Sequence, residues 1–305
     1  MLGFAIRRIA ALVPTLFVII TLSFLIIRLA PGGPFDDEQG MPPAIRANLD
    51  AAYGLDQPLA TQYLRYLNGL LHGDFGPSFK FRDTEVTELI AQGLPVSLTL
   101  GLGAILLSIL VGVPLGICAA LRRDTLIDHG VRTVAALGVA LPAFVIGPLL
   151  ALLFGLYLHW LPVAGWGEPR HLVLPVITLA LPVSAYVARL TRTSFIEVMR
   201  ANFIRTARAK GISELRIVLR HGLRPALMPV VSYLGPATAF IVTGSLVVEM
   251  VFGLPGTGRY LVQGAINRDY TLVMGMIVVY GTLTLLCNLV ADLIYGWLDP
   301  RVRHE

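Results

Sequence analysis

The chain has 305 residues, of which 55% are hydrophobic and only 14% are charged. A soluble globular domain carries about 25% charged residues, so the composition excludes an ordinary soluble domain and predicts an integral membrane protein. Its spans are expected to be helices, because backbone groups in lipid must find their hydrogen bonds within the element. The formal net charge of +5 is less informative than the distribution of the charges along the chain.

The first expected element is a membrane span over residues 9–27, which follows Arg7 and Arg8 and precedes Arg28. This start resembles a secretory signal peptide. However, the apolar run is longer than the core of a signal peptide, about 7–15 residues, and no clear A-x-A cleavage site follows. The sequence therefore predicts an uncleaved first span.

Residues 31–93 form a hydrophilic insert with nine acidic and four basic residues, a balance of −5. Within the insert, residues 43–53 and 57–71 have helix-like patterns. We expect a small folded segment, whose acidity suits the outer side of the membrane.

Five further runs poor in charge are expected to cross the membrane: residues 94–121, 133–161, 172–188, 226–248 and 271–291. Six spans place both termini on the same side. With the N-terminus inside, the inner segments carry 16 Lys and Arg residues and the outer segments carry seven, which satisfies the positive-inside rule. The sequence thus predicts cytoplasmic termini and a cytoplasmic segment between the fourth and fifth spans.

Proline and glycine are frequent within the expected spans. Two interpretations stay open: close helix packing through small residues, and kinked spans that rock around a pathway. The residues concerned are Gly112, Pro114, Gly116, Pro142, Gly147, Pro148, Pro175, Pro182, Pro229, Gly235 and Pro236.

Residues 202–229 are the most basic part of the chain, with six Lys and Arg residues against the single acid Glu214. Gly211 is expected to join two short helices, since glycine can end a helix with a positive φ, and Ser213 is expected to cap the second helix. That helix is predicted to carry a basic and an apolar stripe. The basic stripe is Arg216, Arg220 and Arg224, and the apolar stripe is Ile212, Leu215 and Leu219. Such a segment could lie on the lipid surface, or it could be a handle by which another protein moves the spans.

Motifs for catalysis and metal binding are missing from the sequence. Neither of the two lysines belongs to a G-K-[ST] phosphate loop, so the chain is not expected to hydrolyse ATP itself. H-E-x-x-H, G-x-S-x-G and Cys/His clusters are also absent. Cys118 and Cys287 lie in apolar runs and are expected to be packing residues. The sequence predicts a protein that is no enzyme and holds no cofactor or metal.

Few ionisable residues fall within the expected spans. Arg28 is expected to extend to the membrane surface, and Asp292 to pair with an arginine near the interface. Glu249 follows 24 uncharged residues, and two interpretations stay open: a buried partner at an outer gate, or a solvated span end. The scarcity of buried acids argues against a proton-driven carrier.

Segments along the whole chain carry a family resemblance. RTARAKG at residues 205–211, followed by LRHGLRPALMPV at 219–230, resembles the EAA-loop region of bacterial ABC-importer permeases. Further matching segments are RLAPGGPF (28–35), GDFGPSF (73–79), PVSLTLG (95–101), VVEMVFGLPGTG (247–258), NRDY (267–270) and DPR (299–301). Together they resemble the binding-protein-dependent permease family, and in particular the B-type subunit of peptide importers.

The resemblance implies an all-α, type I ABC-importer permease fold with six transmembrane helices. Gly211 fixes the register of the coupling loop. The residues expected there to engage an ATPase are Arg205, Thr206, Ala207, Arg208, Lys210 and Gly211. At the Glu-Ala-Ala that opens the family consensus this chain has Arg205, Thr206 and Ala207, so only the second Ala is kept and no contact of that Glu can be carried over.

The resemblance also implies partners, a location and a division of the chain. The partners are a second, C-type permease, two cytoplasmic ABC ATPases that carry ATP and Mg²⁺, an extracytoplasmic binding protein, a peptide and membrane lipid, without nucleic acid. The protein is expected in the inner (cytoplasmic) membrane. Its expected parts are a first span (1–30), an extracytoplasmic insert (31–93), a five-helix core (94–293) with the coupling loop 189–225, and a cytoplasmic tail (294–305).

The expected function is that of a permease subunit of an ATP-driven oligopeptide importer. Dipeptides, glutathione and nickel complexes are alternative cargoes within the same family. Outside the family, the alternatives are a gradient-driven carrier and a non-transporting membrane scaffold.

Overall fold

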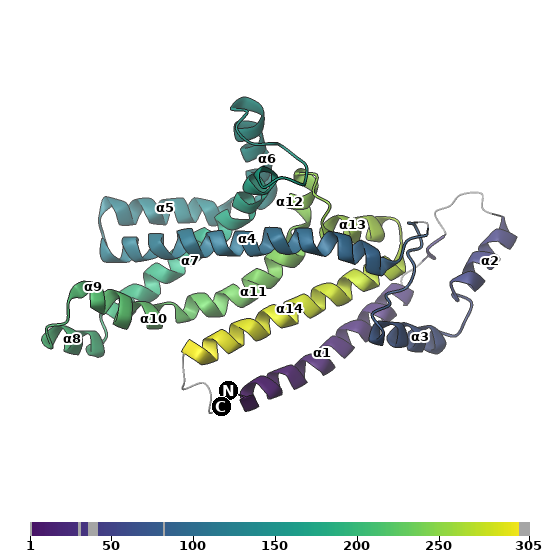
Figure 1. Ribbon diagram of the computed structural model, residues 1–305, viewed down its shortest axis with the longest axis horizontal. Coiled ribbons are helices and arrows are strands. Elements are labelled where there is room, and N and C mark those ends of the chain that lie inside the picture. The colour runs from purple at the N-terminus through teal and green to yellow at the C-terminus, as the bar shows by residue number, and fades with distance from the viewer. Residues whose placement is uncertain (1, 30–31, 36–41, 82, 299–305) are drawn as a thin grey trace. The chain divides into compact units, whose positions relative to one another are not determined.

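The computed structural model describes residues 2–29, 32–35, 42–81 and 83–298 (Figure 1). Within these residues the secondary structure is helical, apart from one isolated β-bridge between Pro77 and Glu85. The DPR segment, most of the expected tail, the acids at 36–38 and the backbone of Arg82 lie outside the described residues.

Five helices are long and apolar enough to cross a membrane, and each coincides with one of the runs predicted from the sequence. They are Ile6–Leu29, Val86–Leu121, Arg170–Met199, Met228–Val251 and Tyr270–Gly296. A sixth span is formed if a bent pair of helices, Leu126–Ala140 and Ala143–Tyr157, is counted as one. The prediction of an all-α protein with membrane-spanning helices is therefore confirmed.

The span predicted over residues 133–161 begins earlier than predicted and is sharply bent, as the interpretation of kinked spans allowed. α5 (Leu126–Ala140) ends just before Pro142, and α6 (Ala143–Leu150) with the π-helical turn η1 (Ala151–Tyr157) continues at a bend of 104°. Leu141 takes an extended conformation (φ −85°, ψ 121°). Proline disfavours the α conformation of the residue before it, so the break falls where Pro142 requires it.

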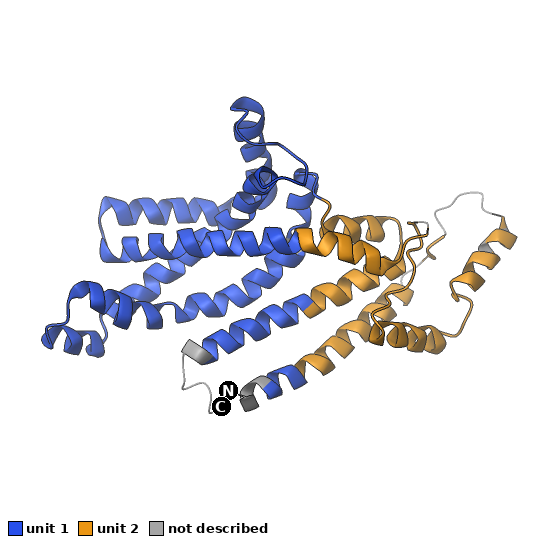
Figure 2. Ribbon diagram, viewed as in Figure 1, with its two compact units in different colours: residues 1–10, 97–254, 283–305 blue, residues 11–96, 255–282 orange. Residues whose placement is uncertain are grey.

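The chain divides into two compact units, drawn in different colours in Figure 2. Unit 1 comprises residues 1–10, 97–254 and 283–305. Besides parts of α1 (Leu2–Leu29), α4 (Val86–Leu121) and α14 (Tyr270–Leu298), unit 1 contains α5, α6, η1, α7 (Arg170–Met199), α8 (Asn202–Ala209), α9 (Glu214–Arg216), η2 (Ile217–Gly222), α10 (Leu223–Ala226), α11 (Met228–Gly244) and α12 (Leu246–Val251).

Helix α7 is the centre of unit 1, because 13 of its 30 residues are buried and α5, α6, α10, α11 and α12 all contact it. Helix α4 approaches α7 at two glycines. A Cβ on Gly112 would lie 2.7 Å from the Ser184 carbonyl oxygen, and a Cβ on Gly116 would lie 2.5 Å from that of Ala188. These two glycines therefore serve close packing between helices, as small residues commonly do in membranes.

Unit 2 comprises residues 11–96 and 255–282. Besides the remaining parts of α1, α4 and α14, it contains α2 (Pro43–Ala52), α3 (Leu59–Leu71) and α13 (Thr257–Ile266). The two helical segments predicted in the hydrophilic insert are thus confirmed to within two residues. The core of the unit is a cluster of Val86, Leu89, Ile90, Leu272 and Met276.

Two of the segments that carry the family resemblance meet within unit 2. Asp269 caps α14, because its Oδ1 accepts hydrogen bonds from the Leu272 N–H (3.1 Å) and the Thr271 hydroxyl (3.0 Å). Its Oδ2 accepts a short hydrogen bond from the Ser78 hydroxyl, and Thr271 Oγ1 also donates to the Pro77 carbonyl (2.6 Å). The GDFGPSF and NRDY segments are therefore joined through one buried carboxylate.

Candidate coupling site

The basic segment forms a helical hairpin, α8 to α10, whose turn is built around Gly211. Gly211 has a φ of +75°, its N–H donates to the Arg208 carbonyl (2.9 Å), and the Ile212 N–H donates to the Ala207 carbonyl (3.3 Å). This pair of bonds is the Schellman arrangement that closes a helix at a residue of positive φ. The predicted junction of two short helices at Gly211 is confirmed.

The hairpin has a small apolar core of its own. Ile204 and Ala207 from α8 and Ile217 from η2 are buried together, with Met199 and Ile212 packed against them. Ile212 thus makes the apolar contact that usually accompanies a Schellman turn. The turn at Gly211 and the apolar core together fix the two arms of the hairpin against each other.

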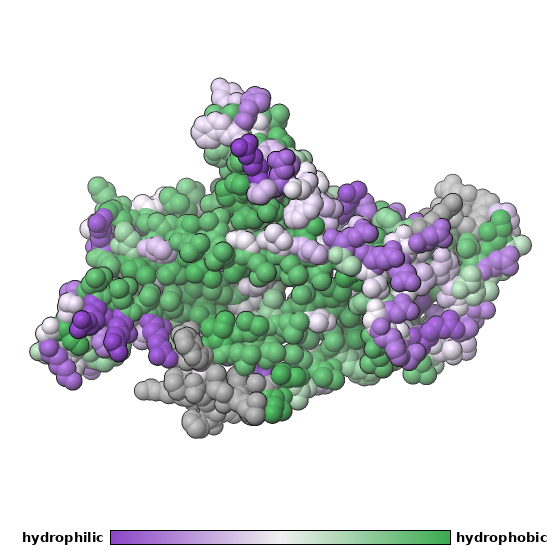
Figure 3. Space-filling model, viewed as in Figure 1, coloured by the Kyte–Doolittle hydropathy of each residue, from purple (hydrophilic) through white to green (hydrophobic). Residues whose placement is uncertain are grey.

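The residues predicted to engage an ATPase lie on the outside of this hairpin, with one exception. Arg205, Thr206, Arg208, Lys210 and Gly211 are exposed, whereas Ala207 belongs to the apolar core. Hydrophilic side chains gather over α8 and α9 in Figure 3. The hairpin therefore presents a basic surface on an apolar base.

One ion pair ties the two arms of the hairpin together. The Arg208 guanidinium donates to both carboxylate oxygens of Glu214, from Nε to Oε1 at 2.7 Å and from Nη2 to Oε2 at 3.3 Å. These hydrogen bonds lower the pKa of Glu214 and raise the pKa of Arg208. Both groups are exposed to solvent, so the pair orients the Arg208 side chain more than it stabilises the fold.

Two details of the predicted second arm are wrong. Ser213 holds the cap position, but its side chain makes no capping hydrogen bond. The predicted apolar stripe is not one continuous face: Ile212 packs against the hairpin core, Leu215 and Leu219 are 70% and 57% exposed, and Ile217 is buried. The arm is not a regular α-helix, since residues 217–222 form the wider π turn η2, which shifts the spacing on which the stripe was predicted. Arg216, Arg220 and Arg224 are all exposed.

Glu249 lies on α12 and is fully buried. Its Oε1 accepts hydrogen bonds from the hydroxyls of Ser97 on α4 (2.6 Å) and Ser245 before α12 (2.5 Å). The interpretation of Glu249 as a solvated span end is therefore wrong, while its role in an outer gate stays a prediction.

Another buried carboxylate, which sequence reasoning missed, joins α5 to α7. Asp128 is fully buried, and its two oxygens accept from Arg192 Nε (2.5 Å) and Nη2 (2.6 Å). The backbone N–H of Asp124 adds a bond of 3.0 Å. The position of an acid in the first turn after Thr125 was a signal for a helix start, but its partner 64 residues later could not be found from spacing.

Asp292 pairs with Arg8 within unit 1, with 3.0 Å between its Oδ2 and Arg8 Nη1. Both side chains are partly exposed. The expectation that Asp292 pairs with an arginine is therefore confirmed.

Several apolar helices long enough to span a membrane, together with an exposed basic hairpin, are typical of a membrane permease. Two family descriptions match the chain: "Binding-protein-dependent transport system inner membrane component" over residues 112–304, and the N-terminal component of the same systems over residues 1–101. The chain belongs to this family of inner-membrane permeases. It is a multi-pass protein of the inner membrane.

Relatives from several bacteria are similar over their whole length. The oligopeptide transport system permease protein OppB of Escherichia coli (strain K12) is 49% identical over 306 residues, covering 100% of both chains. The dipeptide permease DppB of Bacillus subtilis (strain 168) is 42% identical over 303 residues, covering 99% of this chain and 98% of its own. The glutathione permease GsiC of Salmonella paratyphi A is 38% identical over 312 residues, covering 100% of both chains.

A solved structure confirms the fold. An inward-facing MetNI methionine ABC transporter matches with a TM-score of 0.58 at 18% identity, over 69% of this chain and 96% of the other. The fold is therefore that of a type I ABC-importer permease, as the resemblance predicted.

Proposed function

We propose that this chain is a permease subunit of an ATP-driven oligopeptide importer. The observation that carries this proposal is the 49% identity to OppB over the full length of both chains. The identities to the dipeptide and glutathione permeases are lower, at 42% and 38%. Oligopeptides are therefore the favoured cargo.

The energy for transport comes from other subunits in this proposal. A second permease completes the pathway, two cytoplasmic ATPases supply ATP hydrolysis with their Mg²⁺, and an extracytoplasmic binding protein delivers the peptide. The chain carries no phosphate-loop motif of its own. ATP-driven movement of the ATPases would switch the pathway between its inward- and outward-open states.

The hairpin is proposed to be the element that the ATPase moves. Its exposed residues Arg205, Thr206, Arg208, Lys210 and Gly211 would contact the ATPase, while Ala207 would hold the contact surface on the apolar core. α10 and η2 contact α7, so a push on the hairpin reaches the central helix of unit 1 directly. This path supports a coupling role over a lipid anchor.

Glu249 is proposed to act at an outer gate, where α12 meets α4 through the Ser97 hydroxyl. If this contact opens, the Glu249 carboxylate loses the hydrogen bond from the Ser97 hydroxyl. A buried carboxylate without its hydrogen bonds costs free energy, so the contact favours the closed state. Glu249→Gln keeps the volume and removes the charge. Unaltered peptide uptake by the assembled Glu249→Gln complex would count against the gate.

The division of the chain follows the same proposal. Residues 1–30 form the first span, 31–93 an extracytoplasmic insert, 94–293 the core with the cytoplasmic loop 189–225, and 294–305 a cytoplasmic tail. The insert would either seat the binding protein or brace the second permease.

The test is reconstitution of the complete complex in vesicles with ATP inside and the binding protein outside. We expect ATP-dependent uptake of labelled peptides of several residues, at a higher rate than uptake of dipeptides or glutathione. Each cargo is offered at the same concentration, and vesicles with a hydrolysis-deficient ATPase serve as the control. Uptake that a gradient drives without ATPases, or a preference for glutathione, would contradict the proposal.

A further inference from the structure

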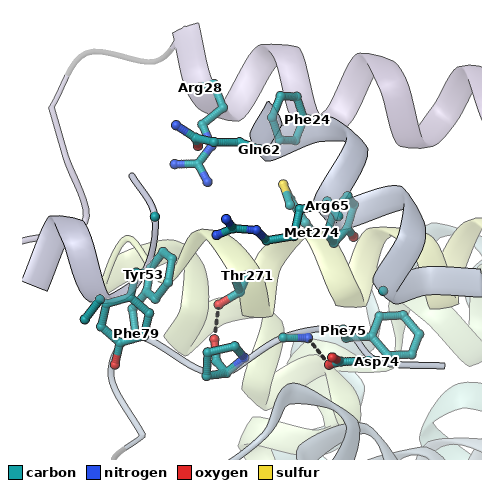
Figure 4. A pocket seen from close by; sticks show the side chains of 16 residues that line it. Phe24, Arg28, Tyr53, Gln62, Arg65, Asp74, Phe75, Phe79, Thr271 and Met274 are labelled. Carbon is teal, nitrogen blue, oxygen red and sulfur yellow. Dashed lines mark hydrogen bonds between the residues drawn. The ribbon is translucent and has the colours of Figure 1, made fainter. Parts of the chain in front are cut away.

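A pocket of about 250 Å³ lies in unit 2. It is lined by the end of α1, by α2 and α3, by residues 74–79 and by the start of α14. Figure 4 shows the guanidinium groups of Arg28 and Arg65 directed into the same space, beside the Gln62 side chain. The proposed transport function assigns no role to this pocket, although the segments 28–35 and 73–79 contribute to its lining.

The pocket is positively charged. Arg28 and Arg65 line it, against the single acid Asp74, whose Oδ1 already accepts a bond from the Gly76 N–H (2.7 Å). The Arg28 guanidinium lies 5.6 Å from the ring centroids of both Phe24 and Tyr270. Arg65 Nη2 donates to the neutral Gln57 Oε1 (2.7 Å). Among the described residues neither arginine forms an ion pair with a carboxylate, so the positive charge of the pocket can attract an anion.

Three polar atoms at the pocket are buried without a hydrogen-bond partner in the described part of the chain: Arg28 Nε, Gln62 Oε1 and Tyr66 Oη. Buried polar groups are normally paired, since an unmade hydrogen bond is costly. Gln62 is only 9% exposed, and its Nε2 donates to the carbonyls of Leu55 (3.1 Å) and Gln57 (2.8 Å). These two bonds fix the orientation of the Gln62 amide, so its Oε1 is an acceptor to which a bound ligand can donate a hydrogen bond.

Tyr66 offers a complementary group. Burial raises the pKa of its phenol, because a phenolate would lose its hydration. The Tyr66 side chain therefore stays protonated and can donate a hydrogen bond. The pocket thus combines two guanidinium groups and an O–H donor with one fixed hydrogen-bond acceptor. A complementary ligand carries negatively charged acceptor oxygens and one hydrogen-bond donor.

We propose that this pocket binds a phosphate oxyanion that also carries a hydrogen-bond donor, such as the ethanolamine or glycerol headgroup of a phospholipid. Arg28 and Tyr66 would donate to the phosphate oxygens, Arg65 would add charge, and Gln62 Oε1 would accept from the headgroup's ammonium or hydroxyl. Arg28 lies one residue from the end of the span Ile6–Leu29, at the level where headgroups lie.

The volume of the pocket agrees with this class of ligand. Sites for drug-sized ligands have volumes of about 300–1,000 Å³, and this pocket is smaller. A headgroup fits into such a volume, whereas a peptide of several residues does not.

The experiment is native mass spectrometry of the complete importer complex, delipidated and titrated with defined probes. The lipid probes are phosphatidylethanolamine, phosphatidylglycerol and phosphatidylcholine, and the soluble probe is glycerophosphoethanolamine. Arg28→Gln and Tyr66→Phe remove one donor each, and the second of these deletes a single oxygen from the folded protein. The matched controls are Arg170→Gln and Tyr157→Phe, which change exposed residues outside the pocket.

We expect one phosphatidylethanolamine or phosphatidylglycerol per chain, with an affinity about tenfold lower in Arg28→Gln and several-fold lower in Tyr66→Phe, as expected for lost hydrogen bonds to an anion. Phosphatidylcholine, whose headgroup has no donor for Gln62 Oε1, should bind more weakly. Binding of the lipids alone assigns the site to a membrane headgroup, and competition by glycerophosphoethanolamine assigns it to soluble phosphates. Equal binding by the wild type and both pocket variants, an equal loss in the controls, or no binding of any probe would overturn the proposal.

Discussion

Asp128 shows how a single buried charge can organise a membrane domain. Burial of a carboxylate costs free energy unless a positive charge pairs with it and both of its oxygens accept hydrogen bonds. Arg192 meets both oxygens of Asp128, and the Asp124 N–H adds a third bond. The pair therefore fixes α5 against α7 near the ends of both helices.

We predict that Asp128→Asn lowers the free energy of unfolding by about 1–3 kcal/mol, because it removes the charge-assisted hydrogen bonds that Arg192 donates to both carboxylate oxygens. The measurement is denaturant unfolding of the purified protein in detergent. The control is Asp124→Asn, which removes the exposed pair with Arg123 (3.1 Å) and a charge interaction with Arg192, and it should cost less than about 1 kcal/mol. Equal losses of unfolding free energy in the two variants would show that the buried ion pair stabilises the protein no more than the exposed pair does.

In the coupling hairpin, the turn at Gly211 could be predicted from the local sequence, but the π turn that follows it could not. Gly211 could be placed from the sequence, because a helix end followed by a glycine has a specific backbone chemistry. The π turn over residues 217–222 could not, since nothing in the order of apolar and basic residues distinguishes it from an α-helix. The predicted stripe of Ile212, Leu215 and Leu219 is therefore interrupted, because Ile217 takes the buried position beside Ile212 while the two leucines are exposed.

The turn at Gly211 can be tested with a matched glycine elsewhere in the chain. Gly211→Val should separate ATP hydrolysis from peptide uptake, because a branched residue at a φ of +75° is strained by about 1–2 kcal/mol and the strain falls on the Schellman turn. No atom lies within 4 Å of a Cβ placed there, so a clash cannot account for the effect. The measurement is the ratio of peptide transported to ATP hydrolysed in reconstituted vesicles.

Gly73 is the control for this prediction. It has the same φ of +75° and equally open surroundings, but it lies in the hydrophilic insert. Gly73→Val therefore carries the same backbone strain and should keep the transport ratio. A normal ratio in Gly211→Val, or a similar loss in both variants, would contradict a specific role of the hairpin turn.

For the whole molecule, the sequence predicted the number and placement of the spans better than their shape. Long apolar runs had to become helices, because lipid offers no other partner to the backbone. The bend of 104° between α5 and α6 was marked only by Pro142, and the charges at residues 122–132 concealed that α5 begins at Leu126. Contacts between distant segments, such as Ser78 with Asp269 and Ser97 with Glu249, depend on tertiary packing that no spacing rule encodes.

The orientation in the membrane is the last prediction, and it rests on charge alone. With the N-terminus inside, 16 Lys and Arg residues lie on the inner side against seven on the outer side. Insertion favours this arrangement, because positively charged loops are retained in the cytoplasm. We therefore expect α3 to face outward and α8 to face the cytoplasm.

Two exposed asparagines permit a matched test, after Cys118 and Cys287 have been replaced by alanine. Asn68→Cys places a thiol on α3, and Asn202→Cys places one at the start of α8. A maleimide that cannot cross membranes should label the first variant in intact spheroplasts and the second only after permeabilisation. The reverse pattern would invert the topology, and it would move the basic hairpin to the side where no ATPase could reach it.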